Sequence, residues 1–196
     1  MRIIIAAGII LISSFAFAAD IPDFQEFSAD VVTADGRAVS RGKTYVARDK
    51  HRMEIPGAVI ITRLDQDKSW VFIPEERIYL EQPIDRKFVS SASEKMANET
   101  GREPLGTEMV DGKSARKYRV SYLDGTGPAV ILQWIDEDTG IPVRTAAVDG
   151  SWSVEYRNIK VGPVDPELFE IPKGYVPVAM PVPPPGIPDD MGREDG

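Results

Sequence analysis

The sequence predicts a mainly β fold of the α+β class, built on one strongly curved antiparallel sheet with a single main helix. Three observations lead to this prediction. Apolar and polar residues alternate with a period of two in many segments, Asp-Gly pairs suited to tight hairpins recur between them, and one segment has a helical period instead. Because strongly twisted sheets curl, we expect a concave face filled by side chains or containing a cavity.

The first segment, residues 1–18, has the order of a secretory signal peptide. A positive charge at Arg2 precedes an apolar run over 3–17, and small residues mark a cleavage site near Ala18-Ala19. An N-terminal membrane anchor is the alternative, but the run is shorter than the ~20 residues that a spanning helix needs. A bacterial lipoprotein signal would require a cysteine, and the chain has none. We therefore expect a soluble mature protein in the periplasm, without a transmembrane anchor after signal cleavage.

The following segments read as strands. Alternation at 118–122 and 152–156 predicts strands with one apolar and one polar face. The runs 59–61, 70–73 and 129–132 are apolar on both sides, which predicts central strands covered on both faces. We predict about ten strands, joined largely as a meander, at approximately 24–33, 39–48, 51–55, 58–64, 69–73, 77–80, 107–112, 115–123, 129–136, 142–148 and 151–161. The Asp-Gly turns begin at Asp35, Asp111, Asp124 and Asp149.

One segment, 85–100, breaks this pattern. Phe88 and Met96 belong to an apolar series that recurs every four residues, with charged residues elsewhere. Asp85 is suited to the N-cap of a helix and Gly101 to its end. The spacing predicts an amphipathic helix that covers part of the concave face.

The last segment, 176–196, contains 6 of the 16 prolines. Proline lacks an N–H donor and fixes φ, so this stretch cannot enter a sheet interior or a helix. We expect an extended, disordered Pro-rich tail, with a proline-recognition ligand as the alternative. The predicted organisation is therefore a signal peptide (1–18), one folded domain (19–175) and this tail.

Composition excludes several classes of function. The chain has 23 Lys+Arg against 31 Asp+Glu and a formal net charge of -8, whereas nucleic-acid binding needs a basic footprint. The absence of cysteine excludes disulfides, thiol catalysis, thiolate-bound zinc and iron–sulfur clusters. The single histidine excludes sites with several histidine ligands. We expect no cofactor, no metal and no nucleic-acid partner.

The remaining candidates for site chemistry have simpler interpretations. His51 lies between two basic residues at a predicted turn, so we favour a surface histidine over a catalytic base. The acidic run 136–138 could ligate Ca²⁺ but lacks a calcium-loop spacing, and a solvated turn is favoured. The same holds for Asp65 and Asp67. No catalytic residues are predicted, and the protein is not expected to be an enzyme.

Aromatic and apolar side chains are the remaining source of specificity. On strands such residues usually form core, and the alternative is the wall of a pocket for an apolar ligand. The candidate ligand-contacting residues are Trp70, Phe72, Tyr79, Phe88, Met96, Tyr118, Trp134, Trp152 and Tyr156.

Four stretches resemble a known family in their order and spacing, and together they span nearly the whole mature domain. They are Gly42–Arg48, Ile60–Asp65 continued by Lys68–Pro74, Trp134–Asp136 with Thr139–Pro142, and Leu168–Tyr175. In this order they resemble the outer-membrane lipoprotein carrier superfamily, the LolA-like proteins, and an uncharacterised periplasmic branch of it.

The resemblance implies an incomplete β-barrel closed by a helical lid over a hydrophobic cavity, which in the family takes the acyl chains of lipoproteins. It also assigns Arg48 to the position of a family arginine that couples the lid to cargo transfer. In this sequence Asp49 follows, where carriers commonly have proline.

Two hypotheses follow. The first is a non-catalytic periplasmic binding protein that holds an acyl chain, a lipoprotein or another apolar ligand in a half-barrel cavity, with a lipid or lipidated protein as partner. The alternative is an interaction or sensor module of the cell envelope, with a filled barrel whose rim or tail contacts an envelope protein.

Overall fold

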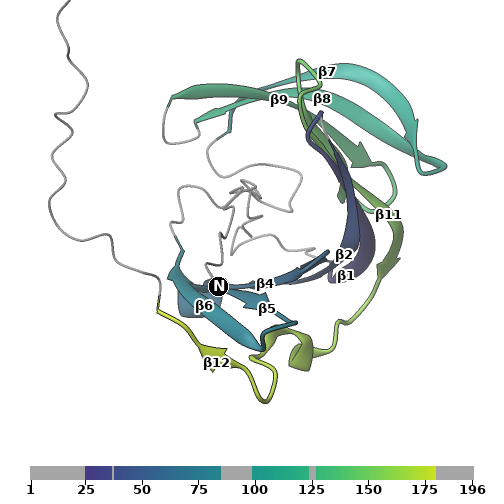
Figure 1. Cartoon of the computed structure of the whole chain (residues 1–196). Coiled ribbons are helices and arrows are strands. Elements are labelled where there is room, and N and C mark those ends of the chain that lie inside the picture. The colour runs from purple at the N-terminus through teal and green to yellow at the C-terminus, as the bar shows by residue number, and fades with distance from the viewer. Residues whose placement is uncertain (1–24, 37, 85–98, 124–126, 180–196) are drawn as a thin grey trace, which may run out of the picture.

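The computed structural model describes residues 25–36, 38–84, 99–123 and 127–179, and its twelve strands form one sheet (Figure 1). The order across the sheet is β12-β6-β5-β4-β3-β2-β1-β11-β10-β9-β8-β7. Two meanders, β1 to β6 and β7 to β11, are joined by the antiparallel pairing of β1 with β11. The sheet curves strongly and is not closed into a barrel, since β12 and β7 end it on opposite sides. The prediction of a mainly β fold with a curved antiparallel sheet is confirmed.

Most strands are joined in sequence by short turns. The strands are β1 (Phe27–Ala34), β2 (Val39–Ala47), β3 (Lys50–Ile55), β4 (Ala58–Arg63), β5 (Lys68–Ile73), β6 (Ile78–Pro83), β7 (Glu99–Val110), β8 (Lys113–Leu123), β9 (Pro128–Asp136), β10 (Pro142–Ala147), β11 (Ser153–Val161) and β12 (Val176–Pro177). Two short 3₁₀ helices are η1 (Leu64–Gln66) and η3 (Pro166–Phe169). Each predicted strand range overlaps one of β1 to β11.

The predicted Asp-Gly hairpin turn at Asp111 is confirmed, whereas Asp124 and Gly125 lie outside the described residues. At the β7–β8 turn, Asp111 has φ 49° and Gly112 has φ 76°, the left-handed values that a tight hairpin needs. The Asp111 Oδ2 atom also accepts the backbone N–H of Asn158 at 2.9 Å. This contact ties the turn to β11, so the β7–β8 hairpin bends back over the sheet.

The start of β7 corrects the prediction for this region. Glu99 and Thr100, predicted as the end of a helix, are strand residues, and β7 runs from Glu99 through the unpredicted stretch 101–106. Alternation is weak in this stretch because the strand lies at the sheet edge, where it is mostly exposed and interrupted by irregular pairing around Pro104 and Gly106. The rest of the predicted helix and lid, residues 85–98, lies outside the described residues.

The C-terminal segment, 163–179, follows β11 and crosses the outer side of the sheet (Figure 1). Val176 and Val178 donate their N–H groups to the carbonyls of Arg77 and Tyr79, which makes β12 a parallel edge strand beside β6. Proline tolerates this position because an edge strand needs hydrogen bonds on one side only. The first residues of the Pro-rich stretch therefore join the sheet, while residues 180–196, like residues 1–24, lie outside the described part of the chain.

Among the residues that the structure describes, none of the helices has the length and hydrophobicity of a membrane span.

Candidate ligand-binding face

The sheet has a concave and a convex face, and the C-terminal segment distinguishes them. Successive side chains of a strand point to opposite faces, and cross-strand partners share a face. Phe169 of η3 packs with Ile61, Trp70 and Phe72, and η3 lies outside the curve of β4 and β5 (Figure 1). These side chains therefore belong to the convex face, and their sequence neighbours belong to the concave one.

Three predicted ligand-contacting residues lie on the convex face. Trp70 and Phe72 are buried there, and Tyr79 packs against Phe72 with ring centroids 5.5 Å apart. Tyr175 closes the cluster edge-on to Phe72 at 5.2 Å. Because the C-terminal segment covers them, these aromatic residues serve as core between the sheet and that segment, and they do not face the concave side where the ligand was predicted.

Trp134 also departs from the predicted placement. Its ring lies between two cations, Lys117 Nζ and the Arg144 guanidinium, each 4.8 Å from the ring centroid. The indole N–H donates to Glu108 at 2.7 Å. Hydrogen bonds from Lys117 and then Trp134 hold the pKa of Glu108 below its usual range. Arg144 is the cross-strand partner of both Trp134 and Glu155, and Glu155 is the sequence neighbour of the concave-face residue Tyr156, so Trp134 is a convex-face residue.

Tyr118 and Tyr156 point to the concave face. Tyr156 lies opposite Val31 and contacts the Phe27 ring at 5.9 Å, and burial raises its pKa. Tyr118 lies opposite Gln133 on β9. Of the seven aromatic residues predicted on strands, these two lie on the concave face, four lie on the convex face, and Trp152 lies outside the strand.

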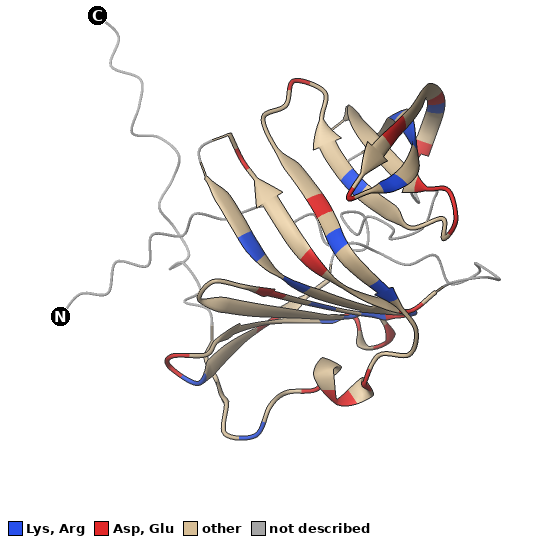
Figure 2. Ribbon diagram, turned by 90° about the vertical axis from the view of Figure 1, so that its right-hand side faces the viewer, with Lys and Arg blue, Asp and Glu red and all other residues tan. Residues whose placement is uncertain are grey.

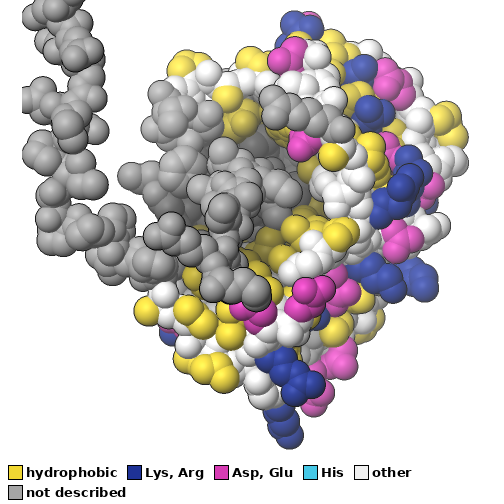
Figure 3. All heavy atoms as spheres, in the orientation of Figure 1, with side chains coloured by type: hydrophobic (Ala, Val, Ile, Leu, Met, Phe, Trp, Pro, Cys, Tyr) yellow, Lys and Arg dark blue, Asp and Glu magenta, His cyan; other side chains and the backbone are white. Residues whose placement is uncertain are grey.

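The concave face is lined largely by aliphatic side chains that the sequence prediction did not select. The register places Met53, Ile60, Val71 and Leu80 in one row across β3 to β6. Ile60, Val71 and Leu80 are only half-buried. Hydrophobic side chains border the hollow side of the molecule (Figure 3). These residues can be identified because side chains alternate between the two faces along a strand. Each one is adjacent in sequence to a residue that the C-terminal segment covers on the convex face.

Charge is divided between the two faces. Acidic and basic residues are spread over the central strands (Figure 2), and register assigns most of them to the convex face, where Arg157 and Glu155 form an ion pair at 2.6 Å. On the concave side of the described strands, the charged residues are the ion-paired Glu99 and Arg102 of β7, and Arg116 near a hairpin end. The concave face is therefore suited to contact with an apolar ligand, and the convex face to contact with solvent.

His51 contradicts the prediction of a surface histidine. It is 3% exposed, and its Nε2 atom lies 2.8 Å from the Thr44 hydroxyl. Burial lowers its pKa from 6.5 to about 4, so the ring is neutral near pH 7. Thr62, also buried, lies opposite His51 on β4. The prediction of a turn at His51 was wrong because β3 begins at Lys50, one residue earlier than predicted. His51 is therefore a strand residue with a buried ring.

In the acidic run 136–138, Asp136 is buried at the end of β9, whereas Glu137 and Asp138 are exposed, as the prediction of a solvated turn requires. Asp136 is 1% exposed, and its Oδ1 atom accepts the backbone N–H groups of Asp138 and Thr139 and the Thr139 hydroxyl. Burial pushes the pKa of Asp136 upward, but the hydrogen bonds from Thr139 and the Lys113 charge outweigh it, and the pKa lies below its usual range. The described residues contain no group of three or more side chains placed to hold a metal ion.

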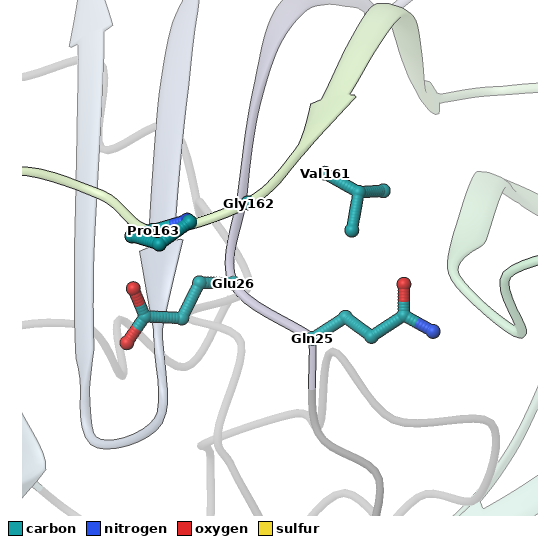
Figure 4. A pocket seen from close by; sticks show the side chains of 5 residues that line it. All are labelled: Gln25, Glu26, Val161, Gly162 and Pro163. Carbon is teal, nitrogen blue, oxygen red and sulfur yellow. The ribbon is translucent and has the colours of Figure 1, made fainter.

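A shallow depression of about 330 Å³ lies where β1 begins and β11 ends (Figure 4). Its lining residues are Gln25, Glu26, Val161, Gly162 and Pro163. The Glu26 backbone and carboxylate accept the N–H groups of Gly162 and Val164, which fixes the start of the C-terminal segment. Because the depression is wide open, it offers little burial to a ligand.

The other predicted residues are dispersed. Phe88 and Met96 lie outside the described residues. Trp152 is half-buried in the turn before β11, and its carbonyl accepts the N–H of Ala147. Arg48 is exposed in the β2–β3 turn. Its role in coupling a lid to transfer stays a prediction.

No protein-family model and no curated protein matches the sequence. Solved structures do match its fold. An uncharacterized conserved protein from Thermus thermophilus is 12% identical, with 79% of this chain and 90% of that chain covered and a TM-score of 0.57.

Two further matches have lower TM-scores. MucB of Pseudomonas aeruginosa, in its complex with MucA, is 13% identical over 74% of this chain and 56% of that chain, with a TM-score of 0.48. The present chain thus spans just over half the length of MucB. The Mycobacterium tuberculosis lipoprotein LppX is 14% identical over 70% and 88%, with a TM-score of 0.42. At these identities the comparisons show the fold alone.

Proposed function

We propose that the protein is a non-catalytic periplasmic binding protein that holds an acyl chain, or a lipidated protein through its acyl chain, against the concave face of the sheet. The observation that carries this proposal is the separation of the two faces. Ile60, Val71 and Leu80 form a half-buried aliphatic row on the concave side, whereas the ion pairs of the central strands lie on the other side.

The physical basis of binding is the removal of apolar surface from water. Burying one CH₂ group contributes about 0.8 kcal/mol, so an acyl chain gains affinity even from a partly enclosed groove. Aliphatic side chains can supply this apolar contact in place of the predicted aromatic set. The predicted signal peptide supports a periplasmic location. A carrier in the periplasm lies between two membranes that contain lipids with acyl chains.

The test is native mass spectrometry of protein isolated from periplasm, where we expect co-purified lipid. Val71→Asp places a charge on the half-buried aliphatic row and should abolish the lipid adduct. Val130→Asp is the matched control, because Val130 lies on the convex face and is 44% exposed. Lipid-free protein, or equal adducts in both variants, would refute the proposal.

A second candidate function rests on the edge of the sheet. β7 is twelve residues long, mostly exposed, and pairs only with β8 among the described strands. Such an edge can accept a strand from an envelope protein. A crosslinker attached at Met109, which is 68% exposed, should then capture a defined partner. If Thr107→Pro abolishes the crosslinked product, this result would support strand pairing.

A further inference from the structure

One group of polar residues interrupts the concave face at its second meander. The Arg102 guanidinium forms two hydrogen bonds to the Glu99 carboxylate, at 2.8 and 2.7 Å. It donates a third to Gln133 Oε1 at 3.0 Å and lies 4.8 Å from the centroid of the Tyr118 ring. We call Glu99, Arg102, Tyr118 and Gln133 the polar subsite.

The polar subsite is built into the sheet. Gln133 is 2% exposed, and the side chains of Arg102 and Glu99 are 13% and 12% exposed. Three strands contribute, β7, β8 and β9, and the Arg102 guanidinium is held by Glu99, Gln133 and the Tyr118 ring. A surface ion pair between mobile side chains would contribute little, but here the partly buried geometry orients both charges before a ligand arrives.

Apolar residues adjoin the polar subsite. Arg102 lies directly opposite Val120, and Val120 lies opposite Ile131 in the same row, both of them buried. On the strands β7 to β9 the concave face therefore carries apolar side chains and one ion pair side by side. An amphiphile whose chain follows the aliphatic rows would bring its head to the ion pair.

The charges of the polar subsite indicate which head fits. Glu99 and Arg102 together carry no net charge, so an anionic head would meet Glu99 and a cationic head would meet Arg102. A zwitterionic head can place its phosphate toward the guanidinium and its ammonium toward the carboxylate and the Tyr118 ring. We propose that the polar subsite binds the zwitterionic phosphate–ammonium head of an amphiphile, an inference that rests on the proposed function.

Three amphiphiles with the same palmitoyl chain test this on the wild-type protein, below their critical micelle concentrations. They are lysophosphatidylethanolamine (zwitterionic), lysophosphatidylglycerol (anionic) and monopalmitoylglycerol (uncharged). We expect the zwitterionic lipid to bind about tenfold more tightly than the other two. Glycerophosphoethanolamine, the head without a chain, should not compete, which separates a lipid ligand from a soluble phosphodiester.

A charge-free variant links the preference to these residues. Glu99→Gln with Arg102→Gln removes both charges and leaves a neutral amide at each position, and it should bind all three amphiphiles with one Kd. Glu155→Gln with Arg157→Gln removes a convex-face ion pair from β11 and should leave the tenfold preference intact.

The outcomes separate the two proposals. If none of the three amphiphiles binds the wild-type protein, the proposed function fails and this inference fails with it. If all three bind equally, or the anionic lipid binds best, the inference alone is overturned and the acyl-chain site stands. These arms need no variant, so they hold even if the charge-free protein does not fold.

Discussion

Neighbouring residues of one strand have different tasks because their side chains point to opposite faces. Val71 lies in the half-buried aliphatic row of the concave face, whereas Phe72 is buried beneath Phe169 and Tyr175. Aromatic size alone does not indicate which face a residue serves. The ligand residues predicted from aromatic character were therefore divided between core and concave face.

Gly42 lies where the backbones of β2 and β3 approach too closely for any side chain larger than hydrogen. A Cβ atom at this position would lie 1.8 Å from the carbonyl oxygen of Glu54, a backbone atom that cannot move aside cheaply. We predict that Gly42→Ala lowers the free energy of unfolding by about 3 kcal/mol, measured by urea denaturation. Gly101→Ala is the control, since its nearest neighbour would lie 4.0 Å away. Equal midpoints for the two variants would contradict the close approach.

His51 makes stability depend on pH in a defined direction. Its pKa is about 4 in the folded protein against 6.5 without burial, so the unfolded chain binds the proton more readily. Its contribution to stability is complete above pH 6.5 and is lost as the pH falls toward 4, at about 1.4 kcal/mol per pH unit.

Unfolding measured between pH 7 and 5 should therefore show a loss of about 2 kcal/mol. This range stays above the titration of ordinary carboxylates. His51→Gln should flatten the dependence, because the chain has no other histidine. An unchanged slope in the variant, or an imidazole that titrates near 6.5 by NMR, would show that the ring is not buried as described.

At the level of elements, the C-terminal segment acts as an outer layer on the first meander. Two arginines hold it: Arg52 donates to the Leu168 carbonyl at 3.0 Å, and Arg63 pairs with Glu170 at 2.6 Å. Arg63 is also bound by Asp65, and hydrogen bonding to Asp65 is the main cause of the raised pKa of Arg63. The segment thus covers the convex face of β4 and β5 by apolar packing and fixes its position by charge.

Phe169→Ala tests this layer. Phe169 is fully buried among Ile61, Trp70 and Phe72, so its truncation should lower the free energy of unfolding by about 3–5 kcal/mol. Val176→Ala is the control, because Val176 is 60% exposed and its loss should change little. A change below about 1 kcal/mol at Phe169 would mean that the segment does not contribute core.

Sequence predicted the strands well because alternation and Asp-Gly turns are local signals. It missed the first half of β7, where edge position removes the need for an apolar face. It also missed the role of Phe169, because which face this residue covers depends on a contact with β4 and β5, about a hundred positions earlier in the chain. Long-range pairing, such as that of β1 with β11, leaves no local pattern.

For the whole molecule, the proposed function follows from an open, curved sheet whose two faces differ in polarity. The convex face carries ion pairs and the C-terminal layer, and the concave face carries the aliphatic rows and the polar subsite. The sequence could indicate a binding function through the resemblance to lipoprotein carriers, but it could not assign the ligand-facing residues, since these are set by register across the sheet.

The most direct measurement of this account compares two adjacent cysteine substitutions. The chain has no cysteine of its own, so Val154→Cys on the concave face and Ser153→Cys on the convex face each introduce a single thiol at a half-buried position of β11. Maleimide labelling of both variants is followed with and without a saturating palmitoyl lipid. We predict that the lipid protects the thiol of Val154→Cys and leaves the labelling of Ser153→Cys unchanged. Equal protection, or protection of Ser153→Cys alone, would contradict binding on the concave face.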